Sequence, residues 1–217
     1  MKTTYSASWQ EDGGAAVPGR LEVTPRAVAF TPAGGEEPHE VRLADVSVVR
    51  RQPSAVELEL RAGDPVRIES VAASVFGAGI ETMVARVETL HALRAEHGSF
   101  EEELRELRAA VQILPELTDV RCHEFGLVAT DLMRRIVRHA HVEELEVYPV
   151  LERLPGGGPL VEAMLLDHRA IEEEACELVR IDRDDRACLM RAFHRLDALV
   201  TTHMAKEETI VFPLLDA

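Results

Sequence analysis

The stretch His139-Ala-His-Val-Glu143-Glu144-Leu-Glu-Val-Tyr148-Pro149-Val-Leu151 recurs 64 residues later as His203-Met-Ala-Lys-Glu207-Glu208-Thr-Ile-Val-Phe212-Pro213-Leu-Leu215. Both copies follow the pattern H-x3-E-E-x2-V-aromatic-P-x-L. A second pair of segments, 96–107 and 167–178, also matches, at an offset of 71 residues, and each contains an acidic residue, a histidine and a run of three glutamates. The sequence after about residue 96 is therefore an internal repeat of two segments.

From residue 97 onward the apolar residues recur every three or four positions, which is typical of amphipathic helices. Capping residues and prolines then predict where four helices begin and end. The expected helices run from residue 81 or 97 to Leu114 before Pro115, from Thr118 or Asp119 to about Leu154, from Leu160 to about Ile181, and from Asp184 or Asp185 to Leu215. Short connections between four such helices favour an up-down-up-down four-helix bundle over residues 96–217.

The repeated motif places a histidine and a glutamate four residues apart, so that both project from one face of a helix. The two pairs are His139 with Glu143 and His203 with Glu207. A neutral imidazole beside a carboxylate chelates transition metals, and bundle interiors assemble di-metal sites from facing helices. One such pair is common by chance, but its repetition with the flanking residues favours a metal site.

The other two helices each contribute one histidine, His97 and His168. With the two chelating pairs they predict a shell of six residues around two metal ions, with both carboxylates able to bridge. Glu101 and Glu172, four residues after His97 and His168, are further candidates that would enlarge the shell to eight. These ligand types fit iron and leave manganese and zinc open.

Residues near the motif divide into supporting and uninvolved groups. Glu144 and Glu208 lie about 100° further round their helices than Glu143 and Glu207. There they either hydrogen-bond to a metal-ligating side chain, without contacting the metal, or face solvent. We expect Tyr148 and Phe212 to pack in the apolar core. The remaining histidines are expected to lie outside the site, and they are His39, His91, His123, His141 and His194.

Residues 1–95 have a different sequence pattern, because short runs of β-branched residues alternate there with turn residues. The expected strands are 20–24, 27–31, 41–43, 46–49, 56–60 and 66–68. A helical apolar stripe from Ile80 to Leu93 follows, and residues 80–114 contain no proline and only one glycine, Gly98, which predicts one nearly continuous helix. The order of elements loosely resembles GRAM or PH-like domains. We therefore expect a two-domain α+β protein, with a small antiparallel β-domain at 1–95 and the bundle at 96–217.

Composition excludes several classes of protein. With 24 basic and 39 acidic residues the formal charge is −15, which argues against a nucleic-acid partner. No apolar run approaches the ~20 residues that a membrane-spanning helix needs, and the first residues do not resemble a signal peptide, so we expect a cytoplasmic protein. Three cysteines without CxxC spacing predict neither disulfides nor a thiolate site. Residues 1–96 carry 10 basic and 14 acidic residues, which favours a protein partner or assembly over a lipid headgroup for this part.

The early histidine followed by His-x3-Glu-Glu-x3-aromatic-Pro, repeated once, resembles the hemerythrin-like HHE cation-binding domains over residues of about 90 to 217. This resemblance implies a four-helix bundle with a non-haem, oxo-bridged di-iron centre. It implies bridging roles for Glu143 and Glu207. The ligands that it implies are His97, His139, Glu143, His168, His203 and Glu207.

One position departs from the oxygen-carrying hemerythrins, which have a second histidine four residues after the third-helix ligand. Here that position is Glu172. A shell richer in carboxylates stabilises ferric iron and favours sensing, redox chemistry or iron handling over simple oxygen carriage. The leading function is binding or sensing of dioxygen or a related small oxidant, such as nitric oxide or peroxide. Two alternatives stay open: a ferroxidase or peroxide-consuming oxidoreductase, and an iron- or redox-dependent interaction switch that acts through the β-domain.

Overall fold

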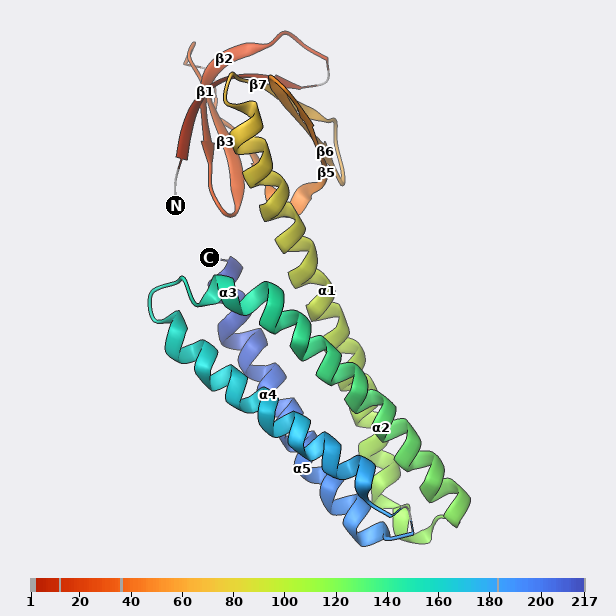
Figure 1. Cartoon of the computed structure of the whole chain (residues 1–217). Coiled ribbons are helices and arrows are strands. Elements are labelled where there is room, and N and C mark those ends of the chain that lie inside the picture. Colours follow the sequence, from red (N-terminus) through yellow and green to blue (C-terminus); the bar gives the residue numbers. More distant parts are fainter. Residues whose placement is uncertain (1–2, 12, 36, 183, 217) are drawn as a thin grey trace. The chain divides into compact units, whose positions relative to one another are not determined.

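The structure is a computed structural model that describes residues 3–11, 13–35, 37–182 and 184–216. It divides into two compact units, with the boundary between Thr89 and Leu90. The first unit is an antiparallel sheet with the beginning of a long helix, and the second is helical (Figure 1). The two-domain α+β layout predicted from the sequence is therefore confirmed.

The sheet of the first unit has seven strands, all of them antiparallel to their neighbours, in the order β4-β3-β2-β1-β7-β6-β5. The strands are β1 (Thr3–Glu11), β2 (Val17–Val23), β3 (Ala27–Pro32), β4 (His39–Arg42), β5 (Val46–Gln52), β6 (Ala55–Leu60) and β7 (Val66–Glu69). Strand β1 was not predicted, although it is central and pairs with both β2 and β7. The likeness to GRAM or PH domains stays a prediction.

Helix α1 (Ala73–Gln112) covers this sheet with its first turns. Phe76, Ile80 and Val84 are buried in the same cluster as the inward side chains of the strands. Gly77 lets the helix approach β6 closely, because a Cβ at this position would lie 2.7 Å from Cγ2 of Val56. The long helix also passes through Gly98 without a break, as the sequence predicted.

The second unit contains the last part of α1 and the helices α2 (Asp119–Val142), α4 (Gly157–Arg180) and α5 (Arg186–Lys206). Two short helices, α3 (Tyr148–Leu151) and α6 (Phe212–Asp216), follow α2 and α5. The hydroxyl of Thr118 and the carboxylate of Asp185 accept hydrogen bonds from the first turns of α2 and α5, so of the alternatives that the sequence left open these two residues are the N-caps. In Figure 1 these helices run alongside one another as a four-helix bundle.

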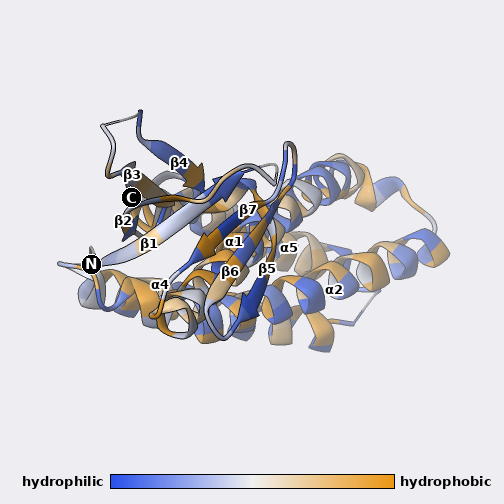
Figure 2. Cartoon of the chain, turned by 90° about the horizontal axis from the view of Figure 1, so that it is seen from above, coloured by the Kyte–Doolittle hydropathy of each residue, from blue (hydrophilic) through white to orange (hydrophobic). Residues whose placement is uncertain are grey.

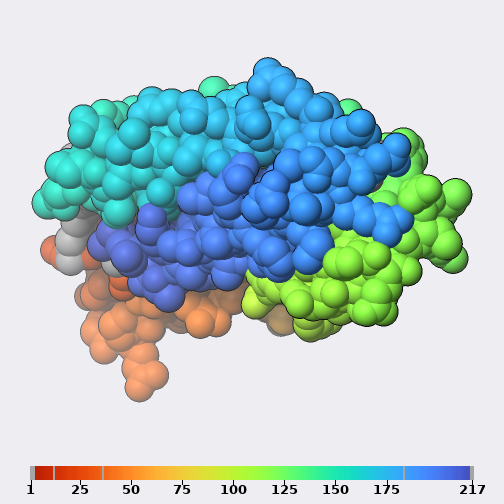
Figure 3. All heavy atoms as spheres, turned by 90° about the horizontal axis from the view of Figure 1, so that it is seen from below, coloured from red at the N-terminus to blue at the C-terminus, as the bar shows by residue number. Residues whose placement is uncertain are grey.

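Each bundle helix is amphipathic, and orange apolar and blue polar stretches alternate along α2 in Figure 2. Helices α4 and α5 pack against each other and lie next to each other on the face drawn in Figure 3. Among the described residues, no helix combines the length and the apolar character that crossing a bilayer requires.

The interior of the bundle has two apolar clusters rather than one. One cluster contains Phe100, Ile136 and Val200, and the other contains Leu93, Met164 and Val211. Each bundle helix changes from one cluster to the other at a buried histidine: His97, His139, His168 or His203. A buried polar layer therefore separates the two apolar parts of the core.

Two π-helical segments interrupt the helices at this layer, η3 (Glu143–Val147) and η4 (Glu207–Val211). Each segment ends two residues before a proline of the repeated motif, Pro149 or Pro213. A proline inside an α-helix has no N–H to donate and clashes with the carbonyl four residues before it, so the α-helical hydrogen-bonding pattern has to change near these residues.

Candidate metal centre

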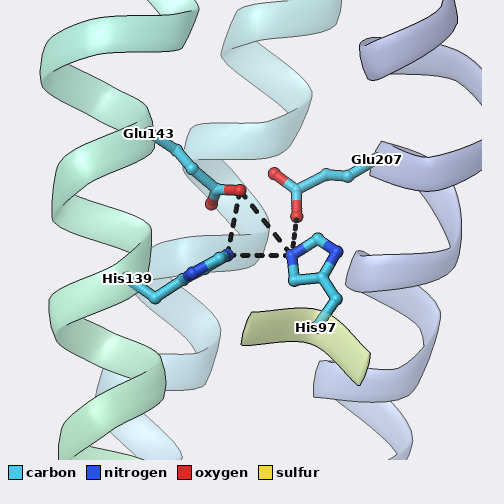
Figure 4. Close-up of side chains that lie close together, drawn as sticks. All are labelled: His97, His139, Glu143 and Glu207. Carbon is cyan, nitrogen blue, oxygen red and sulfur yellow. Dashed lines mark hydrogen bonds and ion pairs between the residues drawn. The ribbon is translucent and has the colours of Figure 1, made fainter. Parts of the chain in front are cut away.

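Six buried side chains from the four bundle helices meet in the polar layer. They form two groups that share both glutamates, and within each group the ligand atoms lie within 4.8 Å of one another. None of the six is more than 6% exposed, and Glu143 and Glu207 are fully buried. Figure 4 shows one group, with His97 from α1, His139 and Glu143 from α2 and η3, and Glu207 from η4. The second group is Glu143, His168, His203 and Glu207.

The four histidines form two pairs that each converge through the inner nitrogens. In the first pair the Nε2 atoms of His97 and His139 lie 2.8 Å apart. In the second pair the Nε2 atoms of His168 and His203 lie 2.9 Å apart. Two imidazole lone pairs repel each other at such a distance unless a cation lies between them or a proton is shared. Each pair therefore marks a position suited to a positive charge.

The two glutamates lie between the pairs and face both. Glu143 Oε1 is 3.1 Å from Nε2 of His139, while its Oε2 is 3.5 Å from Nε2 of His168. Glu207 uses one oxygen, Oε2, to face one histidine of each pair, at 3.4 Å and 3.3 Å. Each carboxylate can thus contact two ions at once.

The outer nitrogen of each histidine faces a further carboxylate. This contact fixes which nitrogen carries the proton and leaves Nε2 free for a metal. Glu144 and Glu208 hold histidines in this way, rather than facing solvent alone. The Nδ1 contacts are His97 to Glu208 at 2.9 Å, His139 to Glu96 at 2.6 Å, His168 to Glu144 at 2.8 Å and His203 to Asp167 at 3.5 Å.

The electrostatics of the site favour cations. Burial lowers a histidine pKa, but contacts with the facing carboxylates and their negative charge outweigh it, so the pKa values of His97 and His168 are raised and that of His139 rises to about 9. Burial alone would raise the pKa of Glu207, yet its contacts with His203 and His97 lower it. The carboxylates thus favour positive charge in this layer, and metal ions that bind here would compete with protons for the histidines.

Three buried carboxylate oxygens have no hydrogen-bond partner among the described residues: Glu143 Oε1, Glu143 Oε2 and Glu207 Oε2. Leaving an ionised carboxylate buried without a partner is costly. These same oxygens are the ones that face the Nε2 atoms of the two histidine pairs. The donor set therefore fits divalent or trivalent transition-metal ions.

Tyr148 and Phe212 occupy matching positions, and each ring stacks on a histidine. Phe212 lies against His97 with centroids 5.5 Å apart, and Tyr148 against His168 at 5.3 Å. Both are buried, as expected, but Tyr148 is more than a core residue. Its hydroxyl donates a hydrogen bond of 2.9 Å to Glu207 Oε1 and lies 3.0 Å from Nε2 of His168.

The sequence interpretation missed Tyr148 as a site residue because it assumed α-helical spacing. In an α-helix, Tyr148 would lie about 140° round from Glu143. In η3 the N–H of Tyr148 instead donates to the carbonyl of Glu143, five residues before it, so the wider turn brings the tyrosine back to the ligand face. Pro149, directly after Tyr148, is the sequence signal for this turn.

The other sequence candidates lie outside both groups. Glu101 and Glu172 are exposed, and neither belongs to a group of potential ligands among the described residues. Four of the five excluded histidines, His91, His123, His141 and His194, are exposed, and His39 is half-buried in the first unit.

A cavity of about 170 Å³ lies beside the site, between α2 and α4. Its lining includes the exposed residues His141, Arg169 and Glu172 and the buried His168. A cavity of about 150 Å³ holds a benzene molecule, so this one suits a small ligand. Glu172 thus lines a small cavity that reaches the site, rather than standing among the buried side chains.

Together the bundle and its two carboxylate-sharing groups define a helical cation-binding domain. A family model described as the hemerythrin HHE cation binding domain matches residues 88–215. The chain therefore belongs to the hemerythrin HHE cation-binding family.

No curated protein matches the chain. Among solved structures, the C-terminal domain of an unknown protein from Leishmania infantum matches with 12% identity, covering 38% of this chain and 82% of that chain. Its TM-score is 0.35.

Proposed function

We propose that this protein holds two iron ions in the bundle and uses them to bind or sense dioxygen or a related small oxidant, such as nitric oxide or peroxide. One observation carries the proposal: two buried histidine pairs face two shared glutamates whose inner oxygens have no hydrogen-bond partner among the described residues. The ligands are His97, His139, Glu143, His168, His203 and Glu207. When bound, iron supplies reversible electron transfer and open positions for a small oxidant.

The surroundings of the site support a small ligand. Apolar clusters lie on both sides of the polar layer, which keeps bulk water from the charged groups. The cavity of about 170 Å³ beside His168 is too small for a large substrate. The outer carboxylates hold the imidazoles in place and make them stronger donors, which stabilises the higher oxidation state of a bound metal.

The test is to load the metal-free protein with Fe(II) under argon and to measure iron content and optical spectra before and after oxygen is admitted. We expect two irons per chain and a charge-transfer band that appears with oxygen. His139→Ala should lose iron, whereas His141→Ala, an exposed residue two positions further on, should bind it normally. A fully loaded protein that saturates at one iron, or whose spectrum does not respond to oxygen, nitric oxide or peroxide, contradicts the proposal.

The same samples distinguish an oxidant-binding protein from an enzyme. Reversible spectral changes on cycling between argon and oxygen support binding or sensing. Continuous consumption of Fe(II) or peroxide over many equivalents per chain would instead indicate a ferroxidase or a peroxide-consuming oxidoreductase.

A further inference from the structure

We propose that Tyr148 is a seventh ligand of the metal centre, and that its phenolate binds the ion held by His168 and His203 in the ferric protein. The inference rests on the proposed function, because it requires iron at the site. It adds a ligand on one side of the centre only. The matching residue on the other side, Phe212, has no oxygen.

The hydroxyl of Tyr148 lies at the spacing of a metal ligand. Ligand atoms bound at right angles to one first-row metal ion, at bond lengths of about 2.1 Å, lie about 3.0 Å apart. Tyr148 Oη is 3.0 Å from Nε2 of His168 and 2.9 Å from Glu207 Oε1. The two histidine nitrogens of this pair are themselves 2.9 Å apart. The hydroxyl therefore has the spacing of a donor that shares an ion with them.

Metal binding to His168 changes the partners of the Tyr148 hydroxyl. Nε2 of His168 cannot exchange a hydrogen bond with Tyr148 once its lone pair binds a metal. The hydroxyl is buried with the rest of Tyr148, which is 2% exposed, so water does not replace that partner. Loss of the phenolic proton to solvent also ends the hydrogen bond that the hydroxyl donates to Glu207 Oε1, and an O–Fe(III) bond gives the oxygen a partner in place of both. Phenolate is an established protein ligand of iron.

The backbone positions the ring of Tyr148 at the site. The π-helical turn of η3 brings Tyr148 to the ligand face, and η4 does the same for Phe212. Both rings stack on histidines at similar distances, so the backbone supports an oxygen equally well on either side. Only the side chain decides that the second pair has one donor more than the first.

The experiment uses the full chain loaded with Fe(II) under argon, oxidised with ferricyanide and desalted. A ferric phenolate gives an intense visible charge-transfer band, and resonance Raman excitation into that band enhances the ring vibrations of the bound phenolate. The chain has two tyrosines, and the other, Tyr5, lies in β1. We expect the band in the wild type and in Tyr5→Phe, and its complete loss in Tyr148→Phe at unchanged iron content.

Variants at Phe212, the matching position of the other half, give a second test. Phe212→Tyr should increase the band about twofold, and the exchange Tyr148→Phe with Phe212→Tyr should restore it to the wild-type level. Two bound irons without phenolate vibrations in the wild type would overturn this inference and leave the proposed function standing. A band that persists in Tyr148→Phe would overturn it as well. Failure to bind iron at all would overturn the proposed function and the inference with it.

Discussion

The bundle contains two versions of the same half-site, and their differences are more informative than their likeness. In each half a histidine from one helix meets a His-x3-Glu pair from the next, a π-helical segment follows, and an aromatic ring stacks on a histidine. The halves differ where the first has Phe212 against its histidine and the second has Tyr148. The histidines and glutamates that both halves share are the residues that a bound cation requires. The aromatic residue that differs can give the two halves different chemistry.

The outer carboxylates show a second difference. Glu96 in the first half and Asp167 in the second are equivalent by the 71-residue offset. Glu96 lies 2.6 Å from Nδ1 of His139, whereas Asp167 lies 3.5 Å from Nδ1 of His203 and accepts a hydrogen bond of 2.6 Å from Lys206. The shorter side chain and the competing ammonium leave His203 less firmly held than His139.

The largest effect should come from the residues that the halves share. Glu143→Gln and Glu207→Gln should each reduce metal loading from two ions to at most one, because an amide removes a charge that faces both histidine pairs. Iron analysis after dialysis measures this loss. Glu146→Gln, an exposed residue in η3, is the matched control and should load normally. Two tightly bound ions in either buried variant would show that the halves do not depend on common ligands.

Removal of the metal should be the next largest effect. A metal that binds only the folded chain, at a concentration 100 times its dissociation constant, adds about 2.7 kcal/mol of stability. For a chain of this size that corresponds to about 5–11 °C in Tm. We expect a chelator to lower the Tm followed by circular dichroism at 222 nm by this amount. The carboxylate oxygens that lack hydrogen-bond partners are the reason to expect this loss. An unchanged Tm would show that the polar layer is stable without cations and would contradict the prediction.

The outer carboxylates should separate the halves more finely. Glu96→Gln should weaken metal binding by about 10-fold or more, which is the usual consequence of losing a carboxylate behind a histidine ligand. Asp167→Asn should weaken it less, because its contact with His203 is already long and shared with Lys206. Competition titrations with a coloured chelator measure both affinities. Equal losses would remove this distinction between the halves.

The smallest effect should come from a backbone position. Gly98 stands where the second copy has Arg169, and a Cβ there would meet nothing within 4 Å. Gly98→Ala should therefore raise the free energy of unfolding by about 0.5–1 kcal/mol without changing metal loading. Gly77→Ala in the same helix is the opposing control, because its Cβ would lie 2.7 Å from Val56 and should destabilise the chain. Urea titrations compare the two variants, and a destabilised Gly98→Ala would be the contrary result.

The repeated motif made most of the bundle predictable. Spacing of four residues placed each His-x3-Glu pair on one face, and side-chain chemistry narrowed each N-cap to two neighbouring residues, of which Thr118 and Asp185 are the caps. Strand β1 escaped notice because small residues separate its inward Tyr5, Ala7 and Trp9, so its alternation is weak in hydropathy.

Two features of the site required three-dimensional information. Tyr148 was assigned to the core alone, since α-helical periodicity contains no π turn. Glu101 and Glu172 were candidates because they too follow a histidine by four residues. In an antiparallel bundle, however, Glu143 lies beyond His139 in the direction of the N-terminal end of α1, whereas Glu101 lies beyond His97 in the opposite direction. The spacing is the same, but the neighbouring helix runs the other way.

The matching π-helical segments also bear on the history of the chain. Each segment adds one residue to a helix, and the two additions stand at the same position of the two copies. One insertion before a gene duplication accounts for both. A single helical hairpin of this kind would supply only half of the ligands, so it would complete the site only as a homodimer with a two-fold axis through the site. Such a dimer would have identical halves by symmetry, whereas two hairpins in one chain allow a tyrosine on one side and a phenylalanine on the other.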